Sequence, residues 1–120
     1  MVMNVIFDFD GVIHSYKSGW QGANVISDVP VPGIKESIQQ IRDAGYTVFV
    51  VSTRCYVEGG IEAIKNWLNN WEIDVDEVTG EKPPAIVQID DRAITFDGDA
   101  GSLLDRIRSF KTWYAKEDTQ

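Results

Sequence analysis

Short apolar runs alternate with amphipathic stretches along the 120 residues of this chain. Three runs, at residues 2–9, 47–51 and 85–89, are rich in β-branched and aromatic residues and have the length of buried strands. A shorter apolar element lies at residues 75–78, and another at residues 94–96 predicts a short edge strand. The pattern therefore predicts a sheet whose strands are separated by other elements.

Three stretches between or after these runs repeat apolar residues at helical spacing. The first covers residues 33–44 and is followed by Gly45, a typical helix stop, and the second covers residues 58–70 or 60–70. The third begins at about Ser102, a candidate N-cap, and ends at about Tyr114, with five apolar side chains expected to face inward: Leu103, Leu104, Ile107, Phe110 and Tyr114. We expect the polar tail at about residues 116–120 to fray.

Strands that alternate with helices pair in parallel through right-handed crossovers. The sequence therefore predicts an α/β fold, a doubly wound three-layer sandwich around a parallel, Rossmann-like sheet. The length suits one hydrophobic core, so we expect a single domain at residues 1–120. Residues 13–31 lack periodicity, are rich in Gly, Ser, Asn and aromatic residues, and are closed by Pro30 and Pro32, which predicts a flap.

Composition and charge argue against several classes of protein. No apolar run approaches the roughly 20 residues of a membrane span, and no basic segment precedes a signal-like apolar core, so we expect a cytoplasmic protein without a membrane partner. The single cysteine, Cys55, forms no internal disulfide. A net charge of −8 repels phosphate backbones, which disfavours a broad nucleic-acid surface but leaves room for a pocket that accepts one phosphate.

Polar side chains stand where the predicted strands end. Asp8 and Asp10 lie at the end of the first run, and Ser52, Thr53 and Arg54 follow the second. Asp90 and Asp91 follow the last run, which Lys82 closely precedes. Because ligands bind beyond the carboxyl ends of parallel strands, we expect these groups to converge on one edge of the sheet. Clustered carboxylates raise one another's pKa unless a cation neutralises them, and oxygen ligands favour Mg²⁺. A lysine and an arginine beside the acids would complete a phosphate pocket.

Four motifs in this order resemble those of the haloacid dehalogenase superfamily. They are a strand ending in Asp-x-Asp-Gly at Val5 to Val12, a strand ending in Ser at Val48 to Ser52, a lysine at Lys82, and a strand ending in acids at Gln88 to Asp91. The runs Ser52-Thr53-Arg54 and Asp90-Asp91-Arg92 are similar to the polynucleotide 3′-phosphatase branch. The resemblance implies a haloacid dehalogenase-like fold. The intervals between the motifs are too short for a cap domain, so the flap would be the only cover of the site.

The resemblance also implies a role for each matched residue. Asp8 would attack phosphorus to form an aspartyl-phosphate, and Asp10 would protonate the leaving oxygen and then deprotonate water. Lys82 and Ser52 would stabilise the charge of the phosphoryl group, with Arg54, Thr53 and Gly11 as further substrate-binding residues. Mg²⁺ would be held by the Asp8 carboxylate, the Asp10 carbonyl, Asp90 and Asp91.

Several of these residues keep a second interpretation. Ser52 would also cap the element that follows it, which would leave Thr53 as the hydroxyl that faces the phosphate. Lys82 is open between a phosphate contact and the solvated surface, and Asp91 between a metal ligand and a partner of Lys82. Arg54 is open between a phosphate contact and a surface ion pair. We expect His14, the only histidine, to contact substrate or solvent from the flap rather than to act in catalysis.

The sequence thus predicts an enzyme, a magnesium-dependent phosphatase that hydrolyses a small phosphorylated metabolite or nucleotide. The alternative is a polynucleotide 3′-phosphatase or a phosphoprotein phosphatase. The resemblance favours a nucleic-acid end as the substrate, whereas the net charge of −8 disfavours it. A phosphoacceptor or regulatory domain without turnover is the non-enzymatic alternative. Receiver domains usually place adjacent acids after the first strand, an order this chain lacks. The sequence leaves the oligomeric state open.

Overall fold

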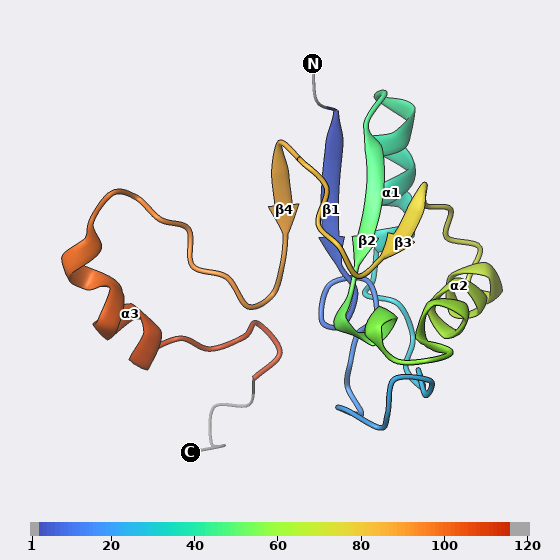
Figure 1. Ribbon diagram of the computed structural model, residues 1–120, viewed down its shortest axis with the longest axis horizontal. Coiled ribbons are helices and arrows are strands. Elements are labelled where there is room, and N and C mark those ends of the chain that lie inside the picture. Colours follow the sequence, from blue (N-terminus) through green and yellow to red (C-terminus); the bar gives the residue numbers. More distant parts are fainter. Residues whose placement is uncertain (1–2, 116–120) are drawn as a thin grey trace. The chain divides into compact units, whose positions relative to one another are not determined.

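The structure is a computed structural model and describes residues 3–115. The chain divides into two compact units, residues 1–90 and 91–120. The first unit contains β1 (Asn4–Asp8), α1 (Ile34–Asp43), β2 (Thr47–Val51), the 3₁₀-helix η1 (Thr53–Tyr56), α2 (Gly60–Asn70), β3 (Glu77–Thr79) and β4 (Val87–Ile89) (Figure 1). The second contains the 3₁₀-helix η2 (Ala100–Ser102) and α3 (Leu103–Arg108). The expected single domain stays a prediction, and the expected polar tail at residues 116–120 lies outside the described residues.

The first unit is built on a four-stranded sheet in the order β3-β2-β1-β4, with every pair of neighbours parallel. The predicted α/β fold with a parallel, Rossmann-like sheet is therefore confirmed. Phe7 of β1 pairs with Val50 of β2 on one side and with Ile89 of β4 on the other. The chain leaves β1 towards β2, whereas β4 lies on the opposite side of β1, so the topological switch point falls between β1 and β4.

Helices α1 and α2 lie on one face of this sheet. The crossovers from β1 to β2 and from β2 to β3 step in the same direction, and right-handed connections then place both helices on the same face. Alternate residues of the strands and one stripe of each helix meet there in a core that includes Val5, Phe7, Phe9, Ile38, Val48, Val50, Ile64 and Leu68. A third layer on the other face stays a prediction.

The predicted flap at residues 13–31 is described throughout, and its only regular pairing is an isolated bridge between His14 and Asp10 and another between His14 and Pro30. Its two ends are fastened to each other, because the Val31 N–H donates to the Ile13 carbonyl at 2.9 Å. The flap is therefore a loop closed at its base beside the carboxyl end of β1. The expected lack of a cap domain stays a prediction.

Two predicted elements of the second unit are wrong. Residues 94–96 form no strand, and the Thr95 carbonyl instead accepts a hydrogen bond from the Arg106 side chain at 2.9 Å. The last helix is also shorter than predicted, since α3 ends at Arg108 and contains no buried residue. Ile107 was expected to face inward but is 61% exposed. Helical spacing alone indicated a helix there, but a stripe of apolar residues does not determine whether that stripe is buried.

None of the helices formed by residues 3–115 combines the length and the apolar composition that a membrane span requires.

The side chain of Asp76 ties three parts of the first unit together. Its carboxylate accepts hydrogen bonds from the Val48 N–H at 2.8 Å and from Arg42 Nε and Nη2 at 3.2 and 3.0 Å. Burial raises the pKa of Asp76, but the Val48 and Arg42 hydrogen bonds outweigh it, so that pKa lies below its ordinary value. The ionised form is therefore the one that stabilises the fold.

The Asp76→Asn variant is expected to lose about 1–2 kcal/mol of unfolding free energy at neutral pH. A lowered folded-state pKa means that this contribution is present above about pH 4 and is lost as the pH falls through the folded-state pKa. Urea unfolding should therefore show a difference in unfolding free energy between the variant and the wild type at pH 7, and this difference should be smaller at about pH 3. Asp74→Asn, an exposed neighbour with the same charge change, is the control, and an equal loss in both variants would contradict the assignment.

Candidate active site

The carboxyl ends of β1, β2 and β4 meet at one edge of the sheet (Figure 1). Asp8 is the last residue of β1, Ser52 follows β2 and Asp90 follows β4. A pocket of about 590 Å³ opens at this edge, and five of the predicted residues line it: Asp8, Ser52, Thr53, Lys82 and Asp90. The pocket thus lies at the switch point, where α/β sheets bind ligands.

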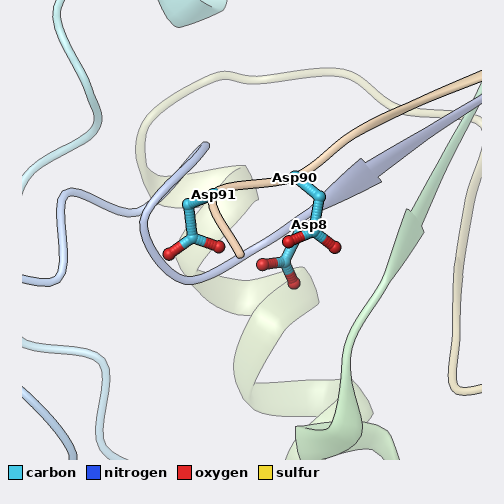
Figure 2. A group of neighbouring side chains, drawn as sticks. All are labelled: Asp8, Asp90 and Asp91. Carbon is cyan, nitrogen blue, oxygen red and sulfur yellow. The ribbon is translucent and has the colours of Figure 1, made fainter. Parts of the chain in front are cut away.

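Three carboxylates gather at this edge. One oxygen each of Asp8, Asp90 and Asp91 lies within 4.8 Å of the others, and Figure 2 shows the three side chains pointing into the same space. Asp91 opens the second unit but is bonded directly to Asp90, so the chain itself holds it near this edge. The spacing allows one cation to contact all three carboxylates.

The donor set fits a hard divalent cation. All three groups offer oxygen, the ligand that Mg²⁺ and Ca²⁺ prefer. Among the described residues, Asp91 Oδ1 is buried without a hydrogen-bond partner, a state that a bound cation would relieve. Two carboxylates are oriented by neighbours, since the Phe9 N–H donates to Asp8 Oδ1 at 2.9 Å and Gln88 Nε2 donates to Asp90 Oδ2 at 2.7 Å. These groups could therefore hold a metal ion.

Ser52, Thr53 and Lys82 bring hydroxyls and a positive charge to the same pocket. Ser52 is 6% exposed, and its Oγ accepts a hydrogen bond from the Arg54 N–H at 3.2 Å, which caps η1. The capping interpretation of Ser52 is therefore correct, and the Oγ–H remains as a donor because only the oxygen is used. Thr53 and Lys82 are exposed residues of the pocket lining. An anion in the pocket would find hydroxyl and ammonium donors in the lining.

Asp10 lies in a separate hydrogen-bonded cluster and is not part of the pocket lining. Its Oδ1 accepts hydrogen bonds from His14 Nδ1 at 2.8 Å and Arg54 Nη2 at 3.1 Å, and its Oδ2 accepts one from Arg54 Nε at 2.8 Å. Burial raises the pKa of Asp10, but the hydrogen bonds from His14 and Arg54 and the charge of Arg54 outweigh it and hold that pKa below its ordinary value. Asp10 is therefore held as a carboxylate in this arrangement.

Arg54 and Gly11, both predicted to bind substrate, have their polar groups engaged elsewhere. The Arg54 side chain is 0% exposed, and its Nη1 donates to the carbonyls of Gly22, Ala23 and Val25 in the flap at 2.9, 3.0 and 3.3 Å. The Gly11 N–H donates to the His14 carbonyl at 2.8 Å. The ion pair of Arg54 therefore involves a buried guanidinium, which differs from the surface ion pair that the sequence left open as an alternative to a phosphate contact.

Sequence reasoning missed the neighbours of Asp10 and one part of the pocket. His14 was expected to meet substrate or solvent, but it is 1% exposed and contacts Asp10 instead. The signal was the four-residue spacing between these two residues, which a tight turn converts into a contact. Tyr56 lines the pocket with 70% of its surface exposed, and its hydroxyl donates to the Gly80 carbonyl at 2.6 Å. No motif marks Tyr56, because its position depends on how η1 packs.

Comparisons with known proteins support the fold. No protein-family model matches the chain, and no curated protein matches its sequence. A conserved protein of Bacteroides thetaiotaomicron has a similar structure, with a TM-score of 0.59 and 22% identity over 97% of this chain and 100% of that one. A crystal structure of a Vibrio cholerae protein matches with a TM-score of 0.50 and 21% identity, over 78% of this chain and 83% of that one.

A chain of the solved Pnkp1/Rnl/Hen1 complex is also similar, with a TM-score of 0.56 and 19% identity over 88% of this chain. This chain spans about a third of that longer one, 35% of its length. At such identities a structural similarity shows the fold alone. The chain therefore has the Rossmann-like α/β fold of these proteins, with an acidic cluster at the switch point of its sheet.

Proposed function

We propose that this chain is a magnesium-dependent phosphomonoester hydrolase that uses Asp8 as a covalent nucleophile. One observation carries the proposal: the carboxylates of Asp8 and Asp90 line a single pocket at the switch point together with Ser52, Thr53 and Lys82, and the Asp91 carboxylate clusters with those two acids. A divalent cation and a phosphoryl group are the ligands whose charges such a set complements. The substrate we favour is a small phosphorylated metabolite or nucleotide.

In the proposed reaction an Asp8 oxygen attacks phosphorus, and the bond between phosphorus and the leaving oxygen breaks. Asp10, a carboxylate in the free protein, would have to take up a proton when the substrate binds, and it would give that proton to the leaving oxygen, so that an alcohol departs and an aspartyl-phosphate remains. Asp10 then takes a proton from water, whose oxygen attacks phosphorus. Inorganic phosphate leaves and the Asp8 carboxylate is regenerated.

The remaining groups would stabilise charge during these steps. Ser52 and Lys82 would donate hydrogen bonds to the phosphoryl oxygens, with Thr53 beside them. Asp8, Asp90 and Asp91, with the Asp10 carbonyl, would hold Mg²⁺, which when bound neutralises the carboxylates and polarises a phosphoryl oxygen. The three carboxylates carry like charges at close range, so the ion is also what lets Asp8 approach an anionic substrate.

Removal of the metal is expected to stop catalysis. Release of inorganic phosphate should be measured from p-nitrophenyl phosphate and a panel of nucleoside monophosphates and sugar phosphates. The wild-type protein should turn over at least one of them with Mg²⁺ and lose the activity in EDTA, and excess Mg²⁺ should restore it. Turnover that persists unchanged in EDTA would contradict the metal-dependent mechanism, and no release from any substrate would leave the regulatory alternative as the better one.

A nucleic-acid end is the second candidate substrate. The similarity to a chain of the Pnkp1/Rnl/Hen1 complex favours it, as do the pocket's position at an open edge and the exposed ring of Tyr56, on which a base could stack. The charge of −8 weighs against a grip on a long backbone. Oligonucleotides with a 3′-phosphate therefore belong in the same panel, and a kcat/KM above that of every small phosphomonoester would make them the preferred substrate.

A further inference from the structure

The flap and the carboxylate of Asp10 are joined by a continuous set of contacts. Arg54 binds Asp10 through Nε and Nη2, and through Nη1 it binds the carbonyls of three flap residues, Gly22, Ala23 and Val25. The guanidinium also lies 4.7 Å from the centre of the Trp20 ring, which belongs to the flap as well. The geometry of Asp10 therefore depends on where the flap lies.

His14 makes the second link between Asp10 and the flap. The Asp28 N–H donates to His14 Nε2 at 3.2 Å, so Nε2 is an acceptor and the ring proton of the neutral imidazole belongs on Nδ1. Nδ1–H then points at Asp10 Oδ1, 2.8 Å away. Because the backbone of Asp28 sets the tautomer, the hydrogen bond to Asp10 has a fixed direction.

Aromatic packing fixes the plane of the His14 ring. The ring stacks on Phe9 with 5.5 Å between centroids and meets the edge of Trp67 at 5.5 Å. Trp67 in turn donates from Nε1 to the Asp28 carbonyl at 3.1 Å, so the same residue supports both the ring and the backbone that sets its tautomer. Because these contacts fix the orientation of the His14 ring, His14 can in turn fix the position of the Asp10 carboxylate.

The two carboxylate oxygens of Asp10 differ in how many of their lone-pair sites are used. A carboxylate oxygen has two lone-pair sites, and both sites of Oδ1 are taken by His14 and Arg54. Oδ2 accepts only the bond from Arg54 Nε among the described residues, which leaves it one site. Oδ2 is thus the atom of Asp10 that is able to exchange a proton with a substrate or water.

We infer that His14 is a positioning residue that, together with Arg54, fixes the Asp10 carboxylate to the flap and leaves Oδ2 as its proton-exchanging atom. The inference rests on the proposed function, in which Asp10 is the general acid and base. It assigns the only histidine of the chain a structural role in proton transfer, without contact between His14 and the substrate.

The test compares substrates that differ in how much they need a general acid. Glycerol 2-phosphate has an alkoxide leaving group that must be protonated, whereas 2,4-dinitrophenyl phosphate has one that leaves without a proton. His14→Phe keeps an aromatic ring against Phe9 and Trp67 but removes the donor to Asp10. We expect it to lower kcat/KM by about 10- to 100-fold for glycerol 2-phosphate and to change it by about twofold or less for 2,4-dinitrophenyl phosphate.

His14→Asn is the rescue variant, because its amide nitrogen can take the place of Nδ1, and it should recover a large part of the loss with glycerol 2-phosphate. The comparison uses kcat/KM, which reports only the steps up to the aspartyl-phosphate. A general loss of folded enzyme would lower kcat/KM for both substrates by the same factor. Equal loss for both substrates, or no loss for either, would overturn the positioning role while the phosphatase assignment stands. No phosphate release by the wild type from either substrate would overturn both.

Discussion

The Asp8→Asn variant should release phosphate at least about four orders of magnitude more slowly than the wild-type protein, because a residue that forms the covalent intermediate has no substitute in the pocket. An asparagine has nearly the same shape as aspartate, so the hydrogen bond from the Phe9 N–H to the side-chain oxygen is preserved. The fold should therefore be retained. Phosphate release from p-nitrophenyl phosphate and the circular dichroism spectrum together separate lost chemistry from lost structure.

Asp105→Asn is the matched control for this experiment. Asp105 is exposed on α3 and does not line the pocket, and its substitution changes the net charge by the same amount. The control should keep the wild-type rate. A folded Asp8→Asn variant with more than about a tenth of that rate would contradict nucleophilic catalysis by Asp8 and would favour direct attack by water.

The sequence was sufficient to predict the sheet and the edge at which the site lies. Strand β2 was predicted with the bounds it has in the structure, because a continuous β-branched run with polar residues after it has few alternatives. The structure shows that β1 and β4 are neighbours in register. The sequence had predicted only that Asp8 and Asp90 lie at the same edge, because the carboxyl ends of parallel strands share one edge. This step required only the topological rules of α/β folds, which are independent of side-chain detail.

The sequence was not sufficient to predict that Arg54 contacts Asp10 and the flap carbonyls instead of the pocket. Arg54 follows β2 by three residues, and nothing in the spacing indicates whether its long side chain reaches the pocket or turns away. Burial decides this, because a guanidinium with no exposed surface needs several acceptors, and Asp10 and the flap carbonyls supply them. The flap lacks periodicity, so its carbonyls cannot be placed from pattern alone.

Loss of Arg54 is expected to be the most damaging substitution for stability. Arg54→Met keeps a long side chain but leaves the Asp10 carboxylate without its charged partner and the flap carbonyls without donors. Removal of one partner of a buried ion pair costs about 3–5 kcal/mol, which corresponds to a fall of roughly 10–20 °C in Tm for a chain of this size. Differential scanning calorimetry measures it, with Arg108→Met, an exposed arginine of α3, as a control that should lose less than about 0.5 kcal/mol.

A second substitution and a change of pH identify the cause of that loss. Asp10→Asn combined with Arg54→Met leaves no buried charge unpaired, so the double variant should be more stable than Arg54→Met alone. A lower pH should also reduce the stability difference between Arg54→Met and the wild type, because it protonates Asp10. In the wild type the lowered pKa of Asp10 means that stability is lost as the pH falls below about 4, whereas without Arg54 burial favours the protonated acid and part of that loss disappears. The difference in unfolding free energy between the wild type and Arg54→Met should therefore become smaller as the pH falls. A gap that stays constant from neutral pH into acid would show that the loss comes from packing and the flap carbonyls instead of the charge on Asp10.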